Sequence, residues 1–75
     1  MTGTMNIMDR AGDTKVIWDA ASADEVATAR RTFDDLRAKG YLAYRVKKGG
    51  EKGEAIRKFD PEAERIILSP AMAGG

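Results

Sequence analysis

The apolar residues of one long segment have the spacing of an amphipathic helix. They recur at three- and four-residue steps, which places them on one helical face: Val26, Ala29, Phe33 and Leu36. Ser22 and Glu25 have the spacing of a capping box, in which the serine accepts a backbone amide and the glutamate reaches back to the serine. Gly40 is the residue type that commonly follows the last turn of a helix. The pattern therefore predicts a helix over residues 23–39.

The rest of the chain concentrates its β-branched and aromatic residues in short runs that are typical of strands. We expect strands at residues 5–10, 14–19, 41–46, 54–59 and 65–69. Residues 11–13 join the first two strands as a hairpin, and the glycine-rich residues 47–53 form a polar hairpin tip. Residues 60–64 turn the chain, either as a loop or through one helical turn that has Asp60 as its cap.

One helix and a mostly antiparallel sheet each have a single apolar face, and packing one on the other buries both. The predicted fold class is therefore α+β, a single domain over residues 1–70 with four to five strands and an extended tail at residues 71–75. In the third strand we expect Leu42, Tyr44 and Val46 to share one face. The predicted core consists of Trp18, Phe33, Leu36, Leu42, Tyr44, Ile66 and Leu68.

Composition argues against several classes of function. The chain has neither histidine nor cysteine, so the common nucleophile–base pairs cannot be built, and we expect no enzymatic activity, no cofactor and no metal site. The formal net charge is only +1, which does not favour nucleic acid or a membrane surface. The longest strongly apolar run, residues 66–68, is far shorter than the ~20 residues that span a bilayer. The start of the chain lacks the pattern of a signal peptide, so we expect a cytoplasmic protein.

Clusters of acidic residues and a glycine-rich loop are better explained by structure than by chemistry. Asp34 and Asp35 are adjacent on the predicted helix and diverge, so they read as a solvated face. Three acids near the last turn lack the alternating pattern of a calcium loop, and turn and capping roles suit them better: Asp60, Glu62 and Glu64. Residues 49–54 lack the Gly-Lys-Ser/Thr ending of a phosphate-binding loop.

A basic stretch between residues 45 and 58 carries six cations against two anions, a local charge of +4. Its members are Arg45, Lys47, Lys48, Lys52, Arg57 and Lys58. The stretch has two interpretations: a minor patch for an acidic partner or nucleic acid, or lysines that protect a hairpin edge from aggregation.

The tail ends in Gly74 and Gly75, after Pro70 has ended the last strand. Frayed termini of small residues are common. The functional alternative is a carboxylate that enters a narrow enzyme channel, where glycines offer no Cβ to clash and leave the backbone amides open to pairing.

Taken together, this order of elements resembles ubiquitin and its β-grasp relatives, including the bacterial sulfur carriers. The segments that carry the resemblance are Met5–Asp19, Ala23–Lys39, Tyr41–Val46, Arg65–Ser69 and the terminal Gly74-Gly75. The chain departs from ubiquitin before its glycines, where residues 71–73 are Ala-Met-Ala instead of basic.

The resemblance implies that a partner enzyme adenylates Gly75, that a partner cysteine carries it as a thioester, and that a lysine or sulfur acceptor receives it. A patch for docking partners would lie on the outer face of the sheet, at Ile17, Tyr41, Ala43 and Ile67. The alternative for these residues is structural: a loop or a second subunit would bury them.

A second class of function stays open from the sequence. A small, charged domain without cysteine also suits a structural or interaction subunit of a larger assembly, for example a phage particle or a multiprotein complex. In that case the tail would become ordered against a neighbouring subunit.

Overall fold

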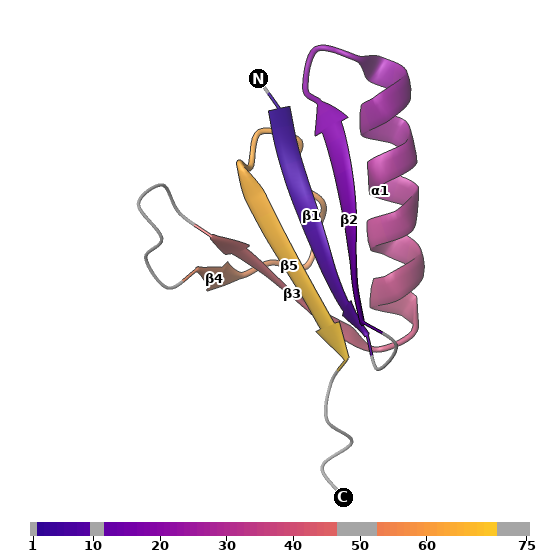
Figure 1. Cartoon of the computed structure of the whole chain (residues 1–75), viewed down its shortest axis with the longest axis vertical. Coiled ribbons are helices and arrows are strands. Elements are labelled where there is room, and N and C mark those ends of the chain that lie inside the picture. Colours follow the sequence, from indigo (N-terminus) through magenta and orange to yellow (C-terminus); the bar gives the residue numbers. More distant parts are fainter. Residues whose placement is uncertain (1, 10–11, 47–52, 71–75) are drawn as a thin grey trace, which may run out of the picture.

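A single sheet with one helix on one of its faces makes up the structure, a computed structural model that describes residues 2–9, 12–46 and 53–70 (Figure 1). The helix is α1 (Ala23–Ala38). The strands are β1 (Thr2–Asp9), β2 (Gly12–Asp19), β3 (Tyr41–Val46), β4 (Glu54–Ala55) and β5 (Arg65–Pro70). The α+β class predicted from the sequence is confirmed.

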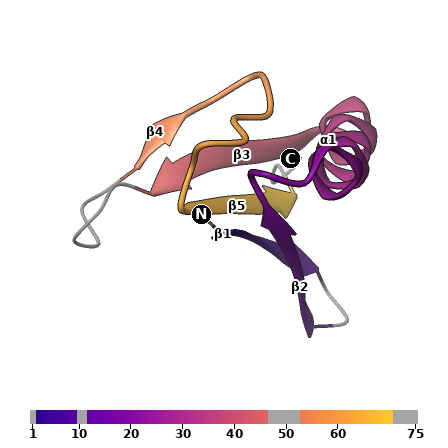
Figure 2. The ribbon, with the colours of Figure 1, turned by 90° about the horizontal axis from the view of Figure 1, so that it is seen from above.

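The order of the strands across the sheet is β2-β1-β5-β3-β4. β1 and β5 are parallel, whereas the other neighbouring strands are antiparallel. The last strand therefore lies in the centre of the sheet, between the first strand and the third. β2 and β3 diverge strongly when the molecule is seen from above, which shows the twist of the sheet (Figure 2). This arrangement is compatible with the predicted β-grasp layout.

The core lies between α1 and the inner face of the sheet. Its largest fully buried side chains are Trp18, Phe33, Met5, Ile66 and Leu68. Phe59 joins them from the loop before β5, with its ring centroid 4.9 Å from that of Trp18 and 5.8 Å from that of Phe33, edge to face in both cases. The predicted burial of Trp18, Phe33, Ile66 and Leu68 is confirmed, and Leu36 packs partly buried against them.

β3 presents the opposite face from the one that we predicted. Leu42 and Tyr44 are 43% and 36% exposed, whereas Ala43 is 2% exposed. The reason is register: Ala43 lies opposite Leu68 and therefore shares its inward face. Both faces of this strand carry apolar residues, so alternation alone could not decide between them.

The fourth strand is shorter than predicted. It covers Glu54–Ala55 instead of residues 54–59, and the amide of Ile56 extends the pairing by one hydrogen bond to the carbonyl of Ala43, at 2.9 Å. The chain then leaves the edge of the sheet, which lets the buried Phe59 reach the core. The first strand, in turn, begins at Thr2, three residues before the predicted start.

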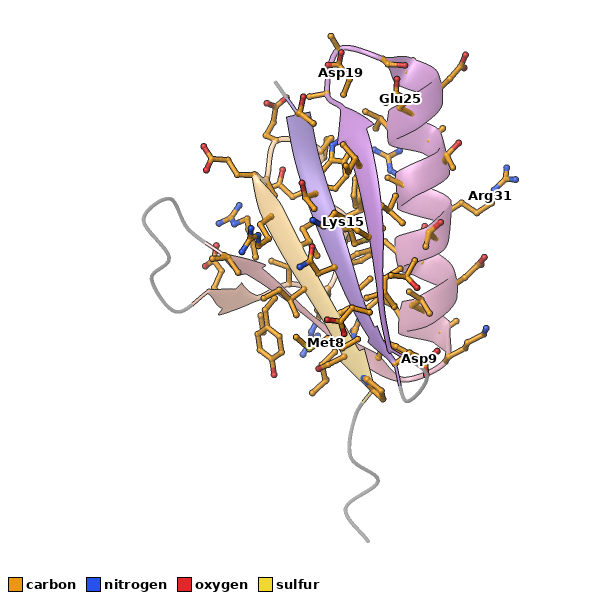
Figure 3. All side chains as sticks on the ribbon, in the orientation of Figure 1. Met8, Asp9, Lys15, Asp19, Glu25 and Arg31 are labelled. Carbon is orange, nitrogen blue, oxygen red and sulfur yellow. The ribbon has the colours of Figure 1, made fainter. Side chains whose placement is uncertain are left out.

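The start of α1 confirms one half of the predicted capping box and corrects the other. Ser22 Oγ accepts the amide of Glu25 at 3.3 Å, as predicted. The carboxylate of Glu25, however, accepts the amide of Asp19 at 3.1 Å and not that of Ser22, which donates to the Asp19 carbonyl at 2.9 Å. Figure 3 shows Asp19 and Glu25 at this junction. The cap therefore fastens the end of β2 to the helix.

Replacing Ser22 with alanine should lower the free energy of unfolding by about 1 kcal/mol, because the Glu25 amide loses its acceptor. Chemical denaturation followed by circular dichroism measures this change. Thr28→Ala is the matched control: its hydroxyl donates to the Asp24 carbonyl within the helix, and alanine has the higher helix propensity. A loss as large for Thr28→Ala as for Ser22→Ala would contradict the capping role.

Candidate functional site

The outer face of the sheet, on the side away from α1, is the most apolar exposed surface among the described residues. Four large hydrophobic side chains are exposed there, on three different strands: Met8, Ile17, Leu42 and Tyr44. Figure 3 shows Met8 and Lys15 over this face. Large exposed hydrophobic side chains that gather on one face are typical of surfaces that bind other proteins.

The register of the sheet joins the centre of this face into one row. Lys15 lies opposite Asn6, Asn6 opposite Ile67, and Ile67 opposite Tyr44, which in turn faces Ala55. The row therefore runs from a charged end on β2, through a half-buried amide, to an apolar end on β3 and β4. Neighbouring side chains of this kind form one continuous surface.

Asn6 is the polar centre of that row. Its Oδ1 atom is buried and has no hydrogen-bond partner. An unpaired buried acceptor costs free energy. The centre of the outer face therefore holds a buried polar group next to the apolar Ile67.

The predicted docking residues divide between the two faces of the sheet. Ile17 is exposed and Ile67 is half-buried, and both lie on the outer face as predicted. Ala43 is buried and Tyr41 packs against the core, so these two belong to the inner face, and their assignment to the docking patch was wrong. The error follows from the inverted faces of β3, and the same correction adds Leu42 and Tyr44 to the outer face.

Three of the six residues of the predicted basic patch lie in the described part of the chain. Arg45 lies on the inner face of β3, where its guanidinium forms ion pairs with Glu54 and with Asp60, the latter at 2.6 Å. Arg57 and Lys58 are exposed in the loop after β4. The other three predicted members lie outside the described residues: Lys47, Lys48 and Lys52.

Asp60 has the turn role that the sequence predicted for it. Asp60 accepts the amide of Glu62 at 2.9 Å and pairs with Arg45, so it holds the turn before β5. Within the described ranges, no three acidic side chains come together as a metal site. Asp34 and Asp35 are exposed on α1. Residues 47–52 of the glycine-rich tip and the tail with Gly74 and Gly75 lie outside the described residues.

No protein-family model matches the sequence, and comparison with curated proteins and with solved structures gave no match. In the part of the chain that the structure describes, no helix has both the length and the apolar character needed to cross a membrane.

Proposed function

We propose that this chain is a ubiquitin-like β-grasp protein that partner enzymes recognise and whose Gly75 carboxylate they activate. The observation that carries the proposal is the strand order β2-β1-β5-β3-β4. It makes the final strand a central one with neighbours on both sides, and β5 ends at Pro70, five residues before Gly75. The cytoplasm, where ATP is available, is the location that this chemistry favours.

The chemistry requires only the backbone of this chain. A carboxylate oxygen of Gly75 attacks the α-phosphorus of ATP, and pyrophosphate leaves, which gives an acyl adenylate. A thiolate of the partner enzyme then displaces AMP and forms a thioester. An acceptor amine attacks the thioester carbonyl, the thiol leaves, and an amide bond results. Residues 74 and 75 lack side chains, so they suit a narrow channel around the reacting carbonyl.

The outer face supplies the recognition that such a reaction needs. Enzyme and substrate must be held together while the small terminal group reacts, and a dipeptide offers little surface for binding. The exposed side chains of Ile17, Leu42 and Tyr44 offer apolar area that does not depend on the tail. This face is the part of the described structure that supports binding to a protein partner.

Intact-mass spectrometry after incubation with lysate of the source organism tests the proposal. With ATP, we expect the full chain to form covalent adducts, some of which are thioesters that a reducing thiol releases. A chain lacking Gly75 should form none, and Gly75→Ala, which keeps the carboxylate but adds a Cβ, should form fewer. Adducts that persist in the truncated chain, or no adducts with ATP in any form, would overturn the proposal.

The exposed apolar face favours one alternative, a non-catalytic subunit of a larger assembly. Such a subunit would use the outer face and the tail as contact surfaces without any covalent step. The adduct experiment distinguishes the two functions. A conjugated modifier forms ATP-dependent adducts that are lost when Gly75 is removed, whereas a non-catalytic subunit forms no ATP-dependent adducts at all.

A further inference from the structure

A hollow of about 280 Å³ opens at the edge of the sheet beside β3. Its lining comes from residues 42–44 of β3 and from the neighbouring residues 55–57, where the chain leaves β4. Arg37, from the last turn of α1, completes the described lining. Because the lining comes from the helix, a central segment of β3 and the edge strand, the folded core fixes its shape.

The described residues that line the hollow include two cations and no anion. The cations are Arg37 and Arg57. Arg37 Nη1 donates to the Tyr41 carbonyl at 2.7 Å, which holds the guanidinium against the end of the sheet. Its Nε is buried and has no acceptor. A planar guanidinium that is held in place and incompletely paired is suited to a carboxylate.

The rest of the described lining is mostly apolar. The apolar lining includes Leu42 and Tyr44, which are exposed on the outer face, and the partly buried Ile56. The volume of the hollow is slightly below the ~300–1,000 Å³ that is usual for small-molecule and cofactor sites. Its size therefore suits one or two side chains, and its chemistry suits an acidic side chain next to an apolar one.

We propose that this hollow binds an acidic residue and its apolar neighbour from an extended segment of a partner protein. The carboxylate lies between Arg37 and Arg57, and the apolar side chain lies against Tyr44 and Leu42. A nucleic acid fits less well, because the chain as a whole carries a net charge of only +1 and affinity for a phosphate backbone depends on many cations. The inference goes beyond the proposed function, since it needs neither ATP nor the terminal glycines.

Amide chemical-shift mapping with a defined peptide tests this site. The probe is acetyl-Leu-Asp-Leu-Glu-Leu-amide, and its control replaces Asp and Glu with Asn and Gln. We expect saturable shifts at residues 42–44 and 55–57, and at the Nε–H resonance of Arg37, with the acidic peptide. The uncharged peptide should bind about fivefold more weakly or not at all, as expected for the loss of a partly exposed charge-assisted hydrogen bond.

Two variants distinguish specific binding in the hollow from a general attraction between the positive charges of the protein and the acidic peptide. Arg57→Gln removes an exposed guanidinium of the hollow, and it should weaken binding of the acidic peptide about fivefold. Arg31→Gln removes the same charge from the outer side of α1, where Figure 3 shows Arg31 projecting into solvent, and it should leave binding unchanged. Both substitutions are on exposed side chains, so neither threatens the fold.

Three results would overturn the inference. The first is an absence of saturable shifts in the hollow, and the second is equal binding of the acidic and uncharged peptides. The third is stronger binding of a short oligothymidylate at the same residues, which would assign the hollow to nucleic acid. Because the titration contains no ATP and does not involve the tail, its failure would leave the adduct experiment to decide the proposed function by itself.

Discussion

Phe33→Ala is expected to leave the domain largely unfolded at room temperature. Phe33 is fully buried, and its ring packs edge to face on Phe59. Removing a buried phenyl ring typically costs about 3–5 kcal/mol. A core of this size rarely supplies more than about 3–5 kcal/mol of net stability, so the loss is comparable to the whole. Urea denaturation followed by circular dichroism and by the fluorescence of the buried Trp18 measures the change.

Leu36→Ala is the matched control for this prediction. It also removes a large side chain from the apolar stripe of α1, but Leu36 is only partly buried. Its loss should be clearly smaller, and the domain should stay folded. If both variants unfolded to the same extent, the stripe as a whole, and not the aromatic cluster around Phe33, would dominate the stability.

Gly3→Ala should be nearly as damaging, although it adds only one carbon atom. Gly3 lies opposite Trp18 in the β1–β2 pair. A Cβ at this position would overlap the indole of Trp18 and lie 2.7 Å from the carbonyl oxygen of Ala63. The indole cannot easily yield, because it is fully buried and its Nε1 donates to the Pro61 carbonyl at 3.0 Å. We expect a loss of about 3 kcal/mol or more, at the upper end for overpacked cores.

Gly12→Ala distinguishes this clash from the general cost of replacing a glycine. Gly12 has φ of 129°, a conformation that side chains rarely adopt, but a Cβ there would have no neighbour within 4 Å. Its substitution should therefore cost about 1 kcal/mol, through the backbone alone. Denaturation of the two variants under the same conditions gives the comparison. Equal losses of unfolding free energy in the two variants would show that a clash with Trp18 does not explain why residue 3 is glycine.

Much of the fold was predictable because its signals are local. The apolar stripe and the serine cap located α1 to within one residue at its end, and the predicted strand over residues 41–46 is β3 as observed. The alternation of Ile66, Ile67 and Leu68 also gave the correct faces of β5. Each of these features depends on residues only a few positions apart.

The features that the sequence did not reveal depend on contacts between distant residues. The inward face of β3 is set by pairing with Leu68, 25 residues away from Ala43. The short β4 results from Phe59 leaving the edge to pack on Trp18. The hollow beside β3 is lined by both Arg37 and Arg57. These two residues are distant in the sequence, so their proximity could not be predicted from a motif or a spacing. From the sequence, the candidate binding surface could therefore be assigned to the outer face of the sheet. The residues of β3 that belong to it could not be identified.

The inverted face of β3 also changes how the candidate surface works. With Leu42 and Tyr44 exposed, the outer face extends to the rim of the hollow, since the same two side chains line both. A partner that covers Leu42 and Tyr44 would therefore also lie next to the hollow. The outer face and the hollow would then act as one binding surface with an apolar part and a cationic part.

Peptide mapping of the ATP-dependent adducts tests the central functional claim most directly. Trypsin cuts after Arg65, so a conjugate through Gly75 carries the uninterrupted remnant of residues 66–75 on its acceptor. If partner enzymes activate Gly75, acceptor peptides will carry this remnant, joined through an amide or thioester at Gly75. Adducts joined through any other residue of the chain, or ATP-treated samples in which no acceptor carries the remnant, would contradict this claim.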